Sequence, residues 1–84
     1  MYNYQVQKKE IFTDTGQRKF LKVRDRVNNM LDSSGAFKMS YAWKNITDDS
    51  FTMLAYVDRL VELGEIREIT GNDVSGQDRV FVRR

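Results

Sequence analysis

The side chains that most often carry catalysis and metal binding are missing from this 84-residue chain. It holds no cysteine and no histidine, which excludes disulfides, thiolate zinc sites, cysteine nucleophiles and imidazole general bases. The scattered carboxylates that could still bind a metal are those of Glu10, Asp14, Asp48, Asp49, Asp73 and Asp78. Their spacing lacks the regular alternation of a calcium-binding loop. We therefore expect no metal, no cofactor and no enzymatic activity.

Cationic side chains are the second group that could do chemistry. The chain has 14 basic and 12 acidic residues, for a formal net charge of +2, so the distribution of charge matters more than its sum. Arg18, Lys22 and Arg26 recur every four residues, which places them on one side of a helix. This basic stripe suits phosphates or an acidic protein surface, although a plain solvated face has the same pattern.

Apolar spacing predicts the helix that carries the basic stripe. Between Gly16 and Asp32 the apolar side chains recur at intervals of three and four, which makes one helical face. They are Phe20, Val23, Val27, Met30 and Leu31. Asp14 or Thr15 offers a side-chain oxygen for the N-terminal cap. Gly35 can end the helix in the left-handed conformation.

Three further elements are predicted between this helix and Gly64. The alternation from Ala36 to Met39 indicates a brief edge strand. Ser40 can then cap a short second helix over residues 41–46, and residues 47–50 are rich in capping side chains that start a third helix. The third helix is expected from Ser50 to Leu63. Its apolar face consists of Leu54, Val57, Leu60 and Val61.

The two ends of the chain read as extended structure. Residues 65–69 and 79–83 alternate between apolar and polar side chains, and the loop between them is rich in turn formers, which predicts a hairpin. Tyr2, Tyr4 and Val6 also alternate with polar residues, so residues 1–13 are expected as an arm or short strand. Such an arm can lie in a groove, join a neighbouring sheet or support self-association. Residues 14–84 then form a single domain.

The order of these elements resembles the winged helix-turn-helix family. The best local match is the segment from Leu54 to Ile66, in which an apolar helix ends in Leu-Gly and enters a strand. The resemblance implies an α+β fold with three helices, a small antiparallel sheet and a C-terminal hairpin, the wing. It also implies that the third helix enters the major groove of double-stranded DNA and that the wing touches the backbone.

The resemblance assigns roles to residues by position. Base contacts fall to the third helix, on a face expected to be open to solvent, through Ser50, Thr52, Met53, Tyr56 and Arg59. Phosphate contacts fall to Arg79 on the wing and, through the basic stripe, to Lys22 and Arg26. The acidic start of this helix opposes the assignment, because Asp48 and Asp49 repel phosphate unless they serve as caps.

Two functions consequently stay open at the level of sequence. The first is a small cytoplasmic DNA-binding regulator, similar in size to accessory proteins of phages and mobile elements. The second is a protein–protein adaptor or homodimerisation module on the same fold. Neither a membrane span nor a secretory signal is expected from the hydropathy pattern. The aromatic residues around the helix-turn-helix, which are Tyr41, Trp43 and Phe51, are expected in the core.

Overall fold

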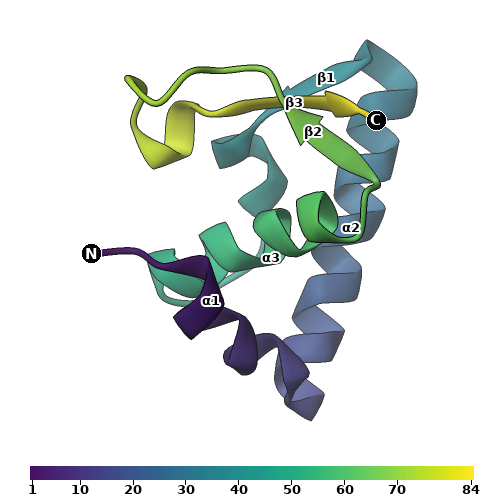
Figure 1. Ribbon diagram of the computed structural model, residues 1–84. Helices are drawn as coiled ribbons and strands as arrows, with labels where there is room; N and C mark the ends of the chain where they lie inside the picture. The colour runs from purple at the N-terminus through teal and green to yellow at the C-terminus, as the bar shows by residue number, and fades with distance from the viewer.

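Two long helices and a small sheet enclose the core of the protein (Figure 1). The computed structural model describes residues 1–84 and has a mixed α+β architecture. The α-helices are α1 (Tyr4–Gln7), α2 (Asp14–Ser34) and α3 (Ser50–Glu62), and the strands are β1 (Ala36–Lys38), β2 (Ile66–Glu68) and β3 (Val80–Arg83). Three short 3-10 turns complete the chain: η1 (Lys8–Phe12), η2 (Met39–Trp43) and η3 (Gly76–Asp78).

Helix α2 follows the predicted apolar spacing closely. Phe20, Val23, Val27 and Leu31 are buried along one face. The N-terminal cap is Thr13, one residue before the positions expected, and its Oγ1 accepts a hydrogen bond from the Gly16 N–H at 3.0 Å. At the other end Gly35 adopts the left-handed conformation, with a φ of 76°, and ends the helix as predicted.

The three strands form one antiparallel sheet in the order β1-β3-β2. Strand β3 is central, with Phe81 opposite Phe37 of β1 and Val82 opposite Arg67 of β2. The rings of Phe37 and Phe81 stack with centroids 5.3 Å apart beneath the sheet. The predicted edge strand and C-terminal hairpin are confirmed, and β2 and β3 form a wing-like hairpin.

The expected second α-helix over residues 41–46 is wrong. The chain instead enters η2 directly from β1, because the Met39 N–H is held by the Arg79 carbonyl at 2.7 Å and the Met39 side chain is buried. Asn45 then adopts a positive φ of 65°, which a right-handed helix does not accommodate. The turn therefore ends before Ile46.

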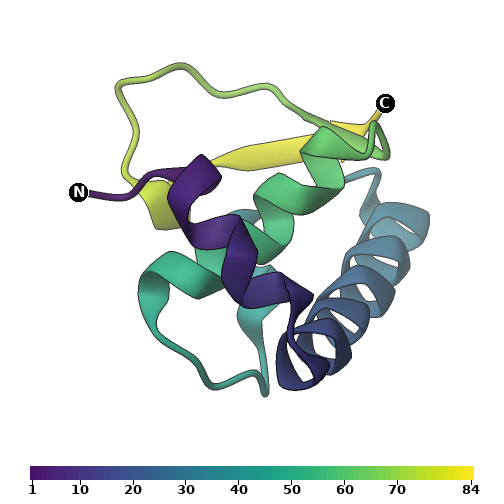
Figure 2. The same ribbon diagram turned by 60° about the horizontal axis from the view of Figure 1, so that its bottom comes forward.

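The expected N-terminal arm or strand is also wrong. Residues 4–12 are helical. Asn3 is the N-terminal cap, and its side chain accepts a hydrogen bond from the Val6 N–H. Ile11 is fully buried in the same core as α2 and α3. In Figure 2 this N-terminal segment, residues 1–13, crosses in front of α3 and meets the start of α2. The N-terminal segment is therefore part of the packed structure and does not form an extended arm.

Helix α3 lies at the centre of the molecule, between the sheet and the N-terminal segment (Figure 1). Its ends agree with the predicted Ser50–Leu63 to within one residue. Of the aromatic residues expected in the core, Trp43 packs against it and donates its indole N–H to the Met53 carbonyl at 3.2 Å. Tyr41 is 61% exposed and Phe51 is also exposed, so for these two the expectation of burial is wrong. None of the helices combines the length and the apolar character that a membrane span requires.

Candidate functional site

The face of α3 that was expected to read bases is covered. Thr52 and Tyr56 were predicted on the solvent side of the helix, but they are 3% and 0% exposed, so that prediction is wrong. Ser50, in the first turn, is exposed. The N-terminal segment and α2 supply the cover, because both pack on α3. The side chains of Thr52 and Tyr56 are therefore not presented to solvent.

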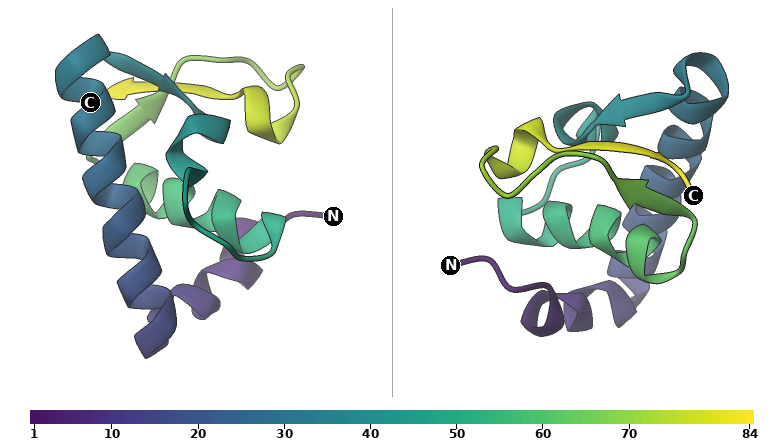
Figure 3. Two further views of the ribbon diagram at one scale, coloured as in Figure 1. Left: turned by 180° about the vertical axis from the view of Figure 1, so that it is seen from behind. Right: turned by 45° about the horizontal axis from the view of Figure 1, so that its top comes forward.

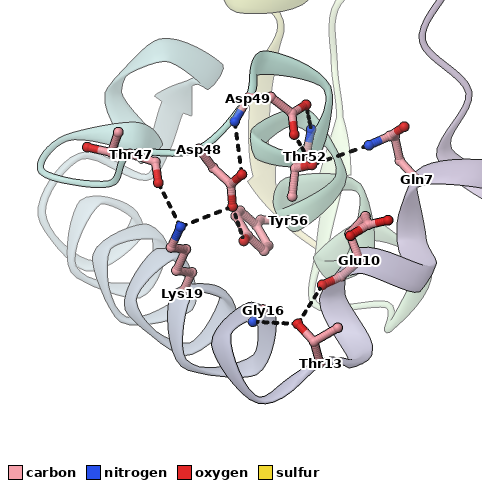
Figure 4. Close-up of polar contacts among 10 residues, drawn as sticks. All are labelled: Gln7, Glu10, Thr13, Gly16, Lys19, Thr47, Asp48, Asp49, Thr52 and Tyr56. Atoms are coloured by element: carbon pink, nitrogen blue, oxygen red, sulfur yellow. Dashed lines mark hydrogen bonds and ion pairs between the residues drawn. The ribbon is translucent and has the colours of Figure 1, made fainter.

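A polar network anchors the start of α3 (Figure 4). The Tyr56 hydroxyl donates to Asp48 Oδ2 at 2.8 Å. Lys19 of α2 donates to the same carboxylate at 3.3 Å and to the Thr47 carbonyl at 2.8 Å. Burial, followed by the hydrogen bond to Asp48 and its charge, raises the pKa of Tyr56 above its ordinary value. Asp48 thus binds the helix start to α2 and is engaged within the fold.

Asp49 is the N-terminal cap of α3. Its two carboxylate oxygens accept hydrogen bonds from the backbone N–H of Thr52 at 3.0 Å and from the Thr52 hydroxyl at 2.7 Å. These bonds hold the pKa of Asp49 below its ordinary value. The side-chain amide of Gln7 donates to the same Thr52 hydroxyl at 3.2 Å, as Figure 4 shows. The cap is therefore also a point of attachment for the N-terminal segment.

Two tyrosines fasten the N-terminal segment to the outer side of α3. The Tyr2 hydroxyl donates to Asp58 Oδ2 at 2.6 Å, and the Tyr4 hydroxyl donates to Glu62 Oε1 at 2.8 Å. Arg59 lies among them. Its guanidinium pairs with Glu62 at 2.6 Å and lies 5.1 Å from the centroid of the Phe12 ring. The one cation expected at base edges is thus already engaged by a carboxylate and an aromatic ring.

The attachment predicts a dependence on alkaline pH. Burial, followed by hydrogen bonds to Asp58 and Glu62, raises the pKa of Tyr2 and of Tyr4 above the ordinary 10.0. A raised folded-state pKa stabilises the folded form fully below pH 10.0, and this contribution is lost as the pH rises further. We expect NMR titration of the phenol carbons to give midpoints above 10.0 for Tyr2, Tyr4 and Tyr56.

Glu62→Gln provides the control for this prediction. It removes the charge beside Tyr4, and we expect the Tyr4 midpoint to move down toward 10.0 while that of Tyr56 stays in place. A Tyr4 midpoint at or below 10.0 in the unmodified protein would contradict the attachment.

Arg79, the expected phosphate contact of the wing, is also engaged. Its Nη2 lies 2.8 Å from Asp58 Oδ1 and 2.9 Å from Glu68 Oε1, and its side chain is largely buried over the ring of Phe81. Burial alone would raise the pKa of Glu68, but hydrogen bonds from Arg79 and Thr70 hold it below 4.5. The guanidinium links β3 to α3 and β2, and a phosphate could reach it only by displacing these carboxylates.

The basic stripe on α2 is the one predicted cationic feature that stays open. Arg18 and Lys22 are exposed and form no ion pair. Arg26 is partly buried and donates from Nε to the Tyr41 carbonyl at 2.6 Å. It has no carboxylate partner, and its terminal nitrogens remain available. The structure therefore separates Lys22 and Arg26 on α2 from the predicted site residues of α3 and the wing.

A groove beside Arg26 is the largest cavity on the surface. It measures about 550 Å³ and lies where the C-terminal half of α2 meets β1 and η2. Figure 3 (left) shows β1 and η2 beside this part of α2. The groove, named here the β1 groove, is lined by Arg26, Met30 and Ser34 of α2, by residues 36–38, and by Tyr41 and Val80. Five of the eight lining residues are hydrophobic.

Sequence reasoning predicted the edge strand but missed the β1 groove. The lining residues come from four separate elements, α2, β1, η2 and β3, and the exposed aromatic ring of Tyr41 was assigned to the core. One signal was present: an edge strand bounded by Gly35 and followed by an aromatic residue leaves one side of the strand unpaired. The depth of the β1 groove depends on the distance between α2 and β1, and no local sequence pattern specifies that distance.

The carboxylates form no group of three or more that could hold a metal ion. A smaller polar cleft of about 240 Å³ lies between the starts of α2 and α3, where Lys19 bonds to Asp48 and Asp49 caps α3. Every buried side-chain nitrogen and oxygen in the protein has a hydrogen-bond partner.

Searches with protein-family models, against curated protein sequences and against solved structures find no match to this chain.

Proposed function

We propose that this chain is a winged-helix domain that works as a protein–protein interaction adaptor. The observation that carries the proposal is the N-terminal segment lying over α3. A helix with its side chains is about 10–12 Å across, and the major groove is about 12 Å wide. A helix that bears a second layer of polypeptide on its outer side does not fit that groove. The adaptor hypothesis needs no such insertion.

Charge supports the same conclusion. A DNA-binding surface gains affinity by placing unpaired cations against phosphates, with release of condensed counterions. Around α3 the cations Arg59 and Arg79 are paired with Glu62, Asp58 and Glu68. To contact a phosphate they would have to leave these partners and expose the carboxylates to the DNA. Binding at this face therefore carries an electrostatic cost.

Parallel selections on the immobilised full-length protein test the proposal. One selection uses a random duplex DNA pool and the other uses a library of random linear peptides. We expect convergent peptide sequences, and no convergent DNA sequence, with duplex affinity in the range of non-specific contacts, about 10⁻⁴–10⁻⁶ M at physiological salt. A convergent DNA sequence that binds far more tightly, and whose affinity falls in Arg59→Gln, would overturn the adaptor and restore base reading by α3.

The open basic stripe favours a second candidate function, sequence-independent contact with nucleic-acid phosphates. In that case the logarithm of duplex affinity falls with the logarithm of salt concentration, and neutralising one contact reduces the slope by about 0.9. Lys22→Gln should then flatten the slope, whereas Lys9→Gln, also exposed and unpaired but outside the stripe, should not. Equal slopes in both variants would contradict phosphate contact through α2.

A further inference from the structure

We propose that the open edge of β1 is a strand-addition site for an extended acidic segment of a partner protein. The inference rests on the proposed adaptor function and names its binding surface and the chemistry of its partner. Its three supports are the unpaired backbone of the strand, the apolar walls of the β1 groove, and the sign of the charges at its rim.

The backbone of β1 offers hydrogen bonds to an added strand. In an antiparallel pair successive residues point their N–H and C=O groups alternately toward and away from the partner strand. The register aligns Phe37 with Phe81, and the Met39 N–H donates to the Arg79 carbonyl. Residues 37 and 39 therefore face β3, and the N–H groups of Ala36 and Lys38 point to the open edge. Because β1 ends the sheet, a partner strand can pair there.

The walls of the β1 groove suit the side chains of such a strand. Side chains of an added strand alternate between the two faces of the sheet. Those opposite Phe37 point to the inner face, where Met30 and Phe37 line the groove. Those opposite Ala36 and Lys38 point to the outer face, which also carries Val80 of β3. A segment that alternates apolar and polar residues would therefore bury its apolar half against α2.

Charge selects the partner. The groove lining contains two cations, Arg26 and Lys38, and no carboxylate. Lys38 already attracts a carboxylate, since Asp78 lies 3.6 Å from its Nζ in a pair that is roughly half exposed. Such exposed pairs contribute little, so an incoming Glu or Asp can replace Asp78. A second copy of this chain, joined edge to edge, would instead bring Lys38 and Arg26 of both copies together and repel. The occupant is therefore a different protein with an acidic strand.

The peptides from the linear library provide the test on the full-length protein. We expect the enriched sequences to alternate apolar residues with Asp or Glu. On titration with such a peptide, the amide resonances of Ala36 and Lys38 should shift, and their hydrogen exchange should slow. Lys38→Glu should weaken binding about ten-fold or more, because it places like charges across the strand pair. Lys44→Glu is the matched control, an exposed and unpaired lysine outside the groove, and should leave affinity unchanged.

Each other outcome overturns the inference at a distinct level. Peptides that bind but shift resonances elsewhere, or whose affinity is unchanged by Lys38→Glu, would rule out the β1 groove as the binding site and leave the adaptor function standing. Failure to enrich any peptide would rule out both the site and the adaptor function. Displacement of the peptide by single-stranded oligothymidine, with shifts at the same amides, would assign the groove to nucleic acid.

Discussion

Replacing Leu60 by alanine should lower the free energy of unfolding by about 2–5 kcal/mol. Leu60 is 1% exposed on α3, at the centre of the core, and α3 packs against α2, β2, η1 and η2. The substitution removes buried methyl groups and leaves a cavity that the elements packed on α3 cannot easily close. Because a small domain has a total stability of only about 5–15 kcal/mol, a large fraction of that stability would be lost.

Urea denaturation followed by Trp43 fluorescence and by far-ultraviolet circular dichroism measures this loss. Leu63→Ala serves as the control, because Leu63 follows the same helix but is 46% exposed. We expect its effect to be within about 0.5 kcal/mol, as for surface substitutions in general. Equal effects of the two substitutions would contradict the central position of α3.

Replacing Gly16 by alanine should destabilise the protein, although glycine-to-alanine changes in helices usually stabilise by about 1 kcal/mol. Gly16 is buried in the first turn of α2, directly beneath the backbone of the N-terminal segment. A Cβ at this position would meet the carbonyl oxygen of Glu10 and would lie 2.8 Å from that of Ile11. Backbone atoms cannot rotate away as side chains do, so α2 and η1 must separate. Overpacking of this kind costs about 1–3 kcal/mol, and occasionally more.

Two measurements check the Gly16→Ala prediction. The free energy of unfolding should fall, and the Tyr2 and Tyr4 phenol resonances should move as residues 1–13 leave α3. Asn29→Ala on the exposed side of α2 is the control and should leave both unchanged or slightly raise stability. A stabilised Gly16→Ala variant with unchanged tyrosine resonances would show that the N-terminal segment does not pack on α2.

The main elements of the fold follow from local patterns. Apolar residues spaced by three and four predicted α2 and α3, and alternation predicted β1 and the hairpin, because burial on one face imposes these periods on any amphipathic element. Gly35 and Asp49 were recognisable for a similar reason, since left-handed termini and side-chain caps have strict residue preferences. The α+β class and the order of α2, β1, α3 and the hairpin were therefore accessible without the structure.

The N-terminal segment shows where such patterns are ambiguous. Alternating tyrosines read as a strand, yet Tyr4 begins a short helix, Tyr2 lies just before it, and their hydroxyls donate to carboxylates 56 and 58 residues away. A phenol is amphipathic, so its place depends on whether the folded chain offers an acceptor. A helix as short as α1 has too few turns for its sequence to distinguish a period of 3.6 residues from a period of 2.

For the candidate site residues too, some properties followed from the sequence and others only from the tertiary structure. The sequence alone determined which residues carry charge and that Arg18, Lys22 and Arg26 share one side of a helix. Only the tertiary structure decided which of the charged groups are free. Thr52 and Tyr56 are polar and looked solvent-facing, but Asp49, Asp48 and Gln7 satisfy their hydroxyls and allow them to be buried. Because a polar side chain can be buried at little cost once its hydrogen bonds are met, polarity did not reveal that α3 is covered.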